Sequence, residues 1–119
     1  MKKWIAVAVV LMLVAAGSVM AAETEIQIAP ATIVLDASCT WVTVHTDLAY
    51  TSVDAATVEL DGIEMAWCKA DARGNFVAKF AFGDVAEYLA PNAGGPVTLT
   101  LTGLAGGEEF AGSATVWVK

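Results

Sequence analysis

The sequence predicts an all-β protein: a β-sandwich of about seven antiparallel strands with one short helix. Three observations carry this prediction. Apolar and polar residues alternate over several short segments, and clusters of Gly, Asp, Asn and Pro separate those segments. The 119 residues suffice for one ordinary hydrophobic core and are too few for two. A partly open β-barrel built from the same strands is the alternative.

Residues 1–22 have the pattern of a secretory signal peptide. A basic start precedes an uninterrupted apolar run at residues 4–16, and small residues suit cleavage just before or after Ala22. We therefore expect export of a single domain, residues 23–119, to the periplasm, the cell surface or the medium. An uncleaved anchor is the alternative, because residues 4–22 together are nearly long enough to span a bilayer. Membrane contact is expected only in that case.

The first strands follow the signal directly. Residues 26–35 predict a split edge strand that changes sheets, because Pro30 cannot donate to a ladder and is confined to edges and bends. Residues 40–46 alternate, which predicts Val42 and Val44 in the core and the side chains between them outside.

Residues 57–82 predict an antiparallel meander, around which the other strands are arranged. Asp61-Gly62 lies between two alternating runs and is a strong hairpin signal, because these residues tolerate the positive φ of a tight turn. The expected strands are residues 57–60, 63–67 and 76–82. Their expected core-facing side chains are Val58, Leu60, Ile63, Met65, Trp67, Phe76, Ala78, Phe80 and Phe82.

The C-terminal third holds the helix and two more strands. Residues 83–89 are the helical candidate, and residues 90–96 contain two prolines and two glycines, which predicts a loop. Residues 97–102 alternate between apolar side chains and threonines, which predicts a half-buried strand. The last strand is expected at residues 110–118, with a bulge at Gly112. The expected inward side chains are Val85, Tyr88, Leu89, Val97, Leu99, Leu101, Val116 and Val118.

Five segments between residues 26 and 118 follow one another in a characteristic order. They are Trp41-Val42-Thr43-Val44, residues 53–62, Val77-Ala78-Lys79-Phe80, residues 97–103 and residues 109–113. In this order they resemble a family of small immunoglobulin-like repeats of exported bacterial and archaeal proteins. The resemblance implies an immunoglobulin-like β-sandwich that serves as a binding or spacer module rather than as an enzyme.

The same family often carries an Asp-rich turn resembling a calcium loop, at the position of residues 71–75 here. Calcium requires six to eight oxygen ligands, and Asp71 and Asn75 supply few of them. Arg73 places a positive charge where a carboxylate would help. We expect a glycine turn there, with no metal site and no cofactor.

The charge balance excludes one class of partner. Lys2 and Lys3 belong to the expected signal, so the mature chain keeps four of the six basic residues and all thirteen acidic ones. Its formal net charge therefore falls from −7 to −9. So acidic a balance argues against polyanions, nucleic acid among them, and against anionic membrane surfaces, because binding to these requires a basic face. Acidic side chains also keep an exported β-protein soluble.

Cys39 and Cys68 both lie in the expected mature domain. An even number of cysteines in an oxidising compartment favours pairing, so we expect one disulfide between them. Two free thiols are the alternative, and a zinc site is disfavoured because one histidine and two cysteines do not complete a familiar ligand set.

No catalytic constellation is evident. Glu59 and Glu64 flank the hairpin on faces expected to be solvated, and Glu108 and Glu109 are neighbours in sequence that point to opposite sides of a strand. His45 is expected on the outer face of its strand, with no nucleophile that can be placed beside it. The sequence therefore predicts a protein that is not an enzyme.

Outward aromatic residues form the candidate binding patch. Trp41 and Trp117 are expected to face away from the core, with Tyr50 near one end, and together they could offer a flat surface for sugar rings or for a protein. Covering of the rim of the sandwich is the alternative role.

Two functions follow from these features. The first is a non-catalytic interaction or structural module of the periplasm or cell surface, whose partner is a protein or polysaccharide of the cell envelope. Self-association through edge strands is possible for such a module. The second is a carbohydrate-binding module that uses the tryptophans for stacking.

Overall fold

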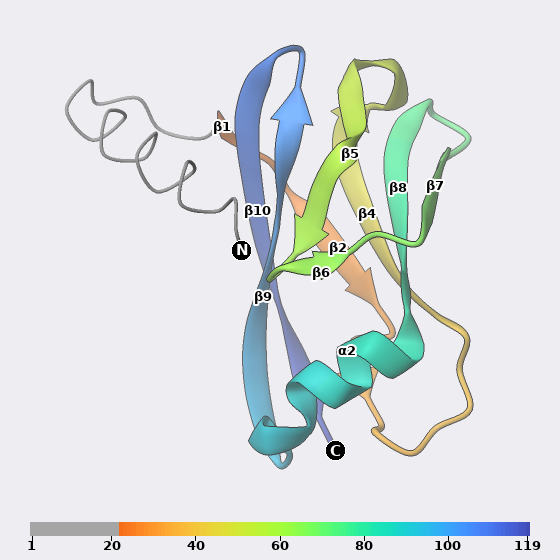
Figure 1. Ribbon diagram of the computed structural model, residues 1–119, viewed down its shortest axis with the longest axis vertical. Coiled ribbons are helices and arrows are strands. Elements are labelled where there is room, and N and C mark those ends of the chain that lie inside the picture. Colours follow the sequence, from red (N-terminus) through yellow and green to blue (C-terminus); the bar gives the residue numbers. More distant parts are fainter. Residues whose placement is uncertain (1–21) are drawn as a thin grey trace, which may run out of the picture.

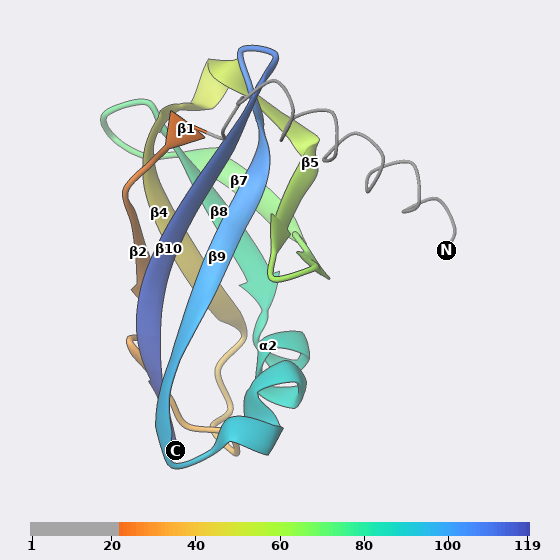
Figure 2. The same ribbon diagram turned by 90° about the vertical axis from the view of Figure 1, so that its left-hand side faces the viewer.

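The computed structural model describes residues 22–119, which form two β-sheets packed face to face (Figures 1 and 2). The predicted all-β sandwich with one short α-helix is confirmed, and the two sheets do not close into a barrel. Ten strands are assigned in this part of the chain, because two of the expected strands are each broken into two pieces and a further short strand precedes the first expected one. The expected signal lies outside the described residues except for Ala22.

The first sheet has the order β1-β10-β9-β5-β6, and β3 also pairs with β10. Its centre is a long antiparallel hairpin whose register runs unbroken from Gly95 opposite Val118 to Ala105 opposite Glu108. The strands of this sheet are β1 (Ala22–Glu23), β3 (Thr32–Ile33), β5 (Val53–Leu60), β6 (Ile63–Glu64), β9 (Gly95–Ala105) and β10 (Glu108–Val118).

The second sheet has the order β2-β4-β8-β7. Three antiparallel pairings hold it together, with β8 between β4 and β7. Its strands are β2 (Ile26–Ala29), β4 (Trp41–Ala49), β7 (Trp67–Ala70) and β8 (Asn75–Ala81). The short helix η1 (Tyr50–Ser52) joins β4 to β5 and so connects the two sheets.

The split first strand is confirmed. β2 pairs with β4 in the second sheet, and after Pro30 the chain crosses to pair β3 with β10 in the first sheet. β1 also pairs with β10, so the N-terminal segment closes one side of the sandwich.

The bulge predicted at Gly112 is wrong, because the register of β10 with β9 continues through it without a shift. This glycine meets a different need. A Cβ atom there would lie 2.5 Å from the Thr24 carbonyl oxygen and 2.8 Å from Cγ2 of Ile26. The missing side chain lets the N-terminal segment cross close over β10.

The Asp61-Gly62 hairpin is confirmed, and both residues have positive φ, 48° and 86°. The prediction of one continuous meander over residues 57–82 is wrong. After Ile63–Glu64 the chain leaves the first sheet and enters the second as β7, which pairs with β8. The crossing resets the inward–outward alternation, so Cys68 faces the core and Trp67, expected inside, is 41% exposed.

The predicted helix is confirmed as α2 (Phe82–Leu89), which is followed by the short helix η2 (Ala90–Asn92). Figure 1 shows α2 closing one end of the sandwich, near the loop that joins β3 to β4. Its buried side chains are Phe82, Val85 and Leu89. Tyr88, expected on the buried side, is 44% exposed.

The core lies between the sheets and contains most of the expected residues. The alternating strands β4, β8, β9 and β10 contribute Val42, Val44, Phe76, Ala78, Phe80, Leu99, Leu101, Val116 and Val118, all buried. Val97 is only partly buried at its edge. Val77 is fully buried as well, although it points to the outer face of β8 and does not belong to the core cluster.

Candidate functional site

The three residues of the expected aromatic patch are not brought together. Trp41 lies on β4 in the second sheet and Trp117 on β10 in the first, each next to inward-facing valines. Their rings are therefore on opposite outer faces of the sandwich. Tyr50, in η1, stacks on Phe76 at a centroid distance of 6.2 Å and an interplanar angle of 26°.

The side chain beside Trp41 is Trp67. Both face outward from the second sheet and pair across β8, where Trp41 is opposite Ala81 and Trp67 is opposite Lys79. Their ring centroids are 5.8 Å apart with an interplanar angle of 78°, an edge-to-face contact. The two side chains are 37% and 41% exposed. Two adjoining strands thus hold an aromatic pair at the surface.

Lys79 completes this surface. Its Nζ lies 5.7 Å from the centre of the Trp67 ring and donates a hydrogen bond to Oγ1 of Thr43 at 2.9 Å. A cation at this distance from an indole face is attracted by the ring quadrupole. We call Trp41, Trp67, Lys79 and Thr43 the tryptophan–lysine surface.

Sequence reasoning singled out Trp41 and missed Trp67. Alternation from Ile63 placed Trp67 with the core residues, because the crossing between sheets leaves no mark in the periodicity. A usable signal was present: Lys69, two residues after Trp67, is a charged residue with the same strand parity. A strand that puts Lys69 outside also puts Trp67 outside.

Two lysines, Lys69 and Lys79, lie on this face, while Arg73 is in the β7–β8 turn next to Asp71. The described residues contain four basic side chains, Lys69, Arg73, Lys79 and Lys119, and the first three belong to β7, β8 or the turn between them. Lys69 is opposite Val77, which is fully buried on the outer side of the sheet. Neighbouring side chains therefore lie over Val77, as the aliphatic stems of lysines do on apolar surface.

The expected disulfide is absent: Cys39 and Cys68 are both unbonded, the first exposed and the second partly buried. Cys68 is on β7, opposite Ala78 of β8, and packs against the core. Cys39 lies two residues before β4, on the other side of β8. Two strand spacings are about 10 Å, which exceeds the Cα separation that a disulfide spans.

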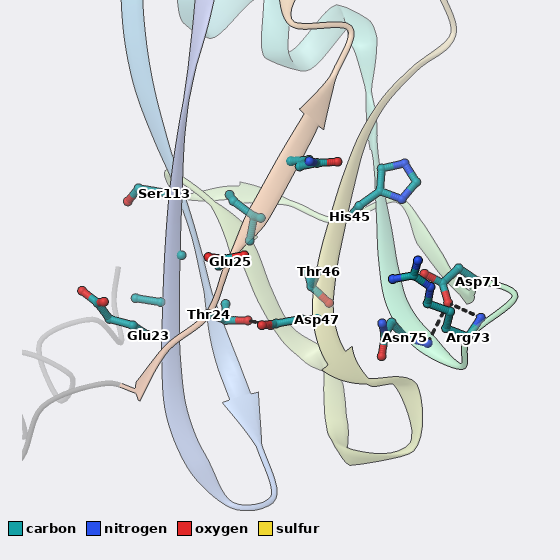
Figure 3. Close-up of a pocket in the computed structure, with 14 residues that line it drawn as sticks. Glu23, Thr24, Glu25, His45, Thr46, Asp47, Asp71, Arg73, Asn75 and Ser113 are labelled. Carbon is teal, nitrogen blue, oxygen red and sulfur yellow. Dashed lines mark hydrogen bonds between the residues drawn. The ribbon is translucent and has the colours of Figure 1, made fainter.

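A polar groove of about 1000 Å³ lies at the opposite end of the second sheet (Figure 3). It runs from β10 across β2 and β4 to the turn between β7 and β8, and its charged or titratable lining is Glu23, Glu25, His45, Asp47, Asp71 and Arg73. Figure 3 shows Thr24 and Asp47 pointing toward each other, and the Thr24 hydroxyl donates to the Asp47 carboxylate. This bond ties the N-terminal segment to β4.

The turn that forms one wall of the groove is held by Asp71. Its Oδ1 accepts hydrogen bonds from the backbone N–H groups of Arg73 at 2.8 Å and Asn75 at 2.9 Å. The bond from Asn75 is the main reason that the pKa of Asp71 lies below its ordinary value; the Arg73 N–H and the charges of Arg73 and His45 act in the same direction, while burial opposes them. Gly74, with φ 83°, supplies the left-handed residue of the turn. Within residues 22–119 no group of three or more His, Cys, Asp or Glu side chains is arranged to hold a metal ion.

The carboxylate pairs considered from the sequence lie outside this groove. Glu59 and Glu64 are directly opposite each other on β5 and β6, both exposed. Glu108 and Glu109 begin β10 and are exposed too. His45 is exposed on β4, as expected, and lines the groove opposite Val77.

Comparisons with known proteins add no relative: no family model, no curated protein and no solved structure matches the chain. In the part of the chain that the structure describes, no helix is long and apolar enough to cross a membrane.

Proposed function

We propose that this protein is a non-catalytic binding module of the cell envelope or the extracellular space, and that the tryptophan–lysine surface binds its ligand. The observation that carries the proposal is the exposed edge-to-face pair of Trp41 and Trp67 on two strands that flank β8. Exposing two large indoles has a cost in water, and a rigid sheet holds them where a ligand could cover them. The expected signal peptide at residues 1–22 supports a location in the cell envelope or outside the cell.

A polysaccharide suits this surface better than a folded protein partner. A stable protein interface buries about 800 Å² on each side around an apolar centre. Here the indoles are bordered by the hydroxyl of Thr43, the ammonium of Lys79 and the small Ala81, with Lys69 two residues along β7 from Trp67, rather than by further large apolar side chains. Sugar rings present both apolar C–H faces and hydroxyl groups, which match aromatic rings and polar neighbours respectively.

Replacement of the two tryptophans tests the proposal. The double variant Trp41→Ala/Trp67→Ala should lose retention on the polysaccharides that retard the native protein in affinity electrophoresis. Trp117→Ala, on the opposite outer face, is the matched control and should be retained like the native protein. Circular dichroism establishes that the variants remain folded. If the double variant is retained as strongly as the native protein, the surface is not the binding site.

Self-association is a second candidate, because β7 ends the second sheet and β6 ends the first. β7 is four residues long and has β8 on one side and no strand of residues 22–119 on the other. Such an edge can accept a strand from another copy. Light scattering tests this: a concentration-dependent mass that Ala70→Pro reduces to the monomer mass supports edge pairing, because the Ala70 N–H points away from β8 in this register, and a monomer at all concentrations excludes it.

A further inference from the structure

We propose that the ligand of the tryptophan–lysine surface is an anionic polysaccharide, one whose sugar rings carry carboxylate or sulfate groups. This inference rests on the proposed function and specifies its ligand. It is carried by the placement of Trp41 and Trp67 beside the positive charges of β7 and β8.

Charge is distributed unevenly over the molecule. The whole chain has a formal net charge of −7, with thirteen acidic residues against six basic ones. Two of the four basic side chains of residues 22–119, Lys69 and Lys79, nevertheless lie on the strands beside the tryptophans, while Arg73 lies in the β7–β8 turn next to Asp71, at the groove end of the sheet. Such an acidic molecule repels polyanions at long range, but salt screens this repulsion beyond about 10 Å, so an anion can bind where the nearest charges are positive. At the tryptophan–lysine surface the nearest charged residues along β7 and β8 are Lys69 and Lys79.

Lys79 is held in place by uncharged groups. Its ammonium group contacts the ring of Trp67 and the hydroxyl of Thr43, both of which are uncharged. An ammonium has three N–H donors, and the bond to Thr43 uses one of them. The side chain is thus held in place by neutral partners while donors remain for an anion, which is the arrangement of a preorganised binding group.

The angle between the indoles of Trp41 and Trp67 determines which shape of ligand they fit. Rings inclined at 78° cannot lie flat in one plane, so together they form a corner. A flat crystalline polysaccharide needs coplanar rings, whereas a single soluble chain can place one sugar against a corner. A sugar stacked on one indole would bring an acidic substituent within reach of Lys79, whose Nζ is 5.7 Å from the centre of the Trp67 ring.

Acidic side chains at the other end of the second sheet set the orientation. Glu25 just before β2, Asp47 on β4 and Asp71 in the β7–β8 turn all line the groove. They disfavour an anionic chain in the groove and direct its charges toward Lys69 and Lys79.

Calorimetric titration of the protein with three soluble polymers tests the inference. Polygalacturonate is the carboxylated sugar, dextran is the neutral sugar, and polyglutamate is a polyanion without sugar rings. We expect binding of polygalacturonate that weakens as salt is added, with little binding of the other two. Lys79→Gln should weaken binding about tenfold, the effect of losing one hydrogen bond to a charged group. Lys79→Arg should restore it, because the positive charge returns.

Lys119→Gln is the matched control. It removes the same charge from a residue that is hydrogen-bonded to Ile33 of the first sheet and does not belong to the tryptophan–lysine surface, so affinity should be unchanged. Lys69→Gln should lower both affinity and salt dependence. Equal effects of Lys79→Gln and Lys119→Gln, or equal affinity for dextran, would overturn the anionic ligand and leave the proposed function standing. Equal affinity for polyglutamate would overturn the inference that the ligand contains sugar rings. If Trp41→Ala/Trp67→Ala changes the binding of no polymer, the proposed function itself fails.

Discussion

The hydroxyl of Tyr88 donates a hydrogen bond to Oδ2 of Asp61 at 2.9 Å, which ties helix α2 to the turn between β5 and β6. The other oxygen of Asp61, Oδ1, accepts from the backbone N–H of Thr100 at 2.9 Å, and the Asp61 N–H donates to the Thr100 carbonyl. One turn residue with a positive φ thus joins the hairpin, the centre of the first sheet and the helix. This explains why Tyr88 stays exposed while the rest of its helix face is buried.

Tyr88→Phe should lower the free energy of unfolding by about 0.5 kcal/mol, because the bond is lost at a screened, exposed position. The bond to Asp61 is also the main reason that the pKa of Tyr88 is raised above its ordinary value. A raised pKa in the folded state means that this stabilisation is complete below pH 10 and is lost as the pH rises through the folded pKa. Urea unfolding between neutral and alkaline pH should show this loss in the native protein. An identical pH dependence in Tyr88→Phe would contradict the assignment.

Gly112→Ala should destabilise the protein by about 1–3 kcal/mol, the range for forcing an atom into a packed site. Its Cβ would lie 2.5 Å from the Thr24 carbonyl oxygen, so the N-terminal segment must move away from β10. Gly95→Ala is the control, because a Cβ there meets nothing within 4 Å. Hydrogen exchange should show faster exchange of the β2 amides in Gly112→Ala alone. Equal stability of the two variants would show that the close approach is not required.

Glu64→Lys should stabilise the protein by about 0.5 kcal/mol, because it replaces a repulsive cross-strand pair with an attractive one. Glu59 and Glu64 are directly opposite each other at the edge of the first sheet. Glu108→Lys changes the net charge equally without creating that pair. Thermal unfolding at low salt should rank Glu64→Lys above Glu108→Lys. The reverse order would mean that the two carboxylates do not interact across the strands.

Cys39 and Cys68 should both react with a thiol reagent when the purified protein is unfolded without reductant. In the folded protein the exposed Cys39 should react first with a thiol reagent, and the partly buried Cys68 more slowly. Adding reductant should leave the midpoint of unfolding unchanged. A protein without free thiols, or one that reductant destabilises, would show that the two residues approach each other more closely than β8 between them allows.

Local patterns in the sequence predicted most of the fold. The Asp61-Gly62 turn, the alternation of β9 and β10 and the break at Pro30 each depend on a few neighbouring residues, and all three are observed. Gly112 is different, because its requirement comes from Thr24, which is far away in the sequence. A bulge and a close crossing both select glycine, and the sequence does not distinguish them.

The candidate site was predicted only in part, for a related reason. Trp41 follows from the alternation of a single strand, whereas its contact with Trp67 depends on the passage of the chain from one sheet to the other after Glu64. The order of strands, with β8 between β4 and β7, likewise separates Cys39 from Cys68, and the place of β10 in the first sheet leaves Trp117 on the opposite face. A pattern of alternation predicts that a segment is a strand but not which sheet the strand joins. Trp41 and Trp67 meet because their strands join the same sheet.

The most direct test of the binding surface is an NMR titration of the protein with a soluble galacturonate oligomer, following the indole N–H signals of Trp41, Trp67 and Trp117. We expect the signals of Trp41 and Trp67 to shift together and saturate, while that of Trp117 stays in place. A shift confined to Trp117, or no shift of any of the three at concentrations at which the oligomer is bound, would contradict this expectation.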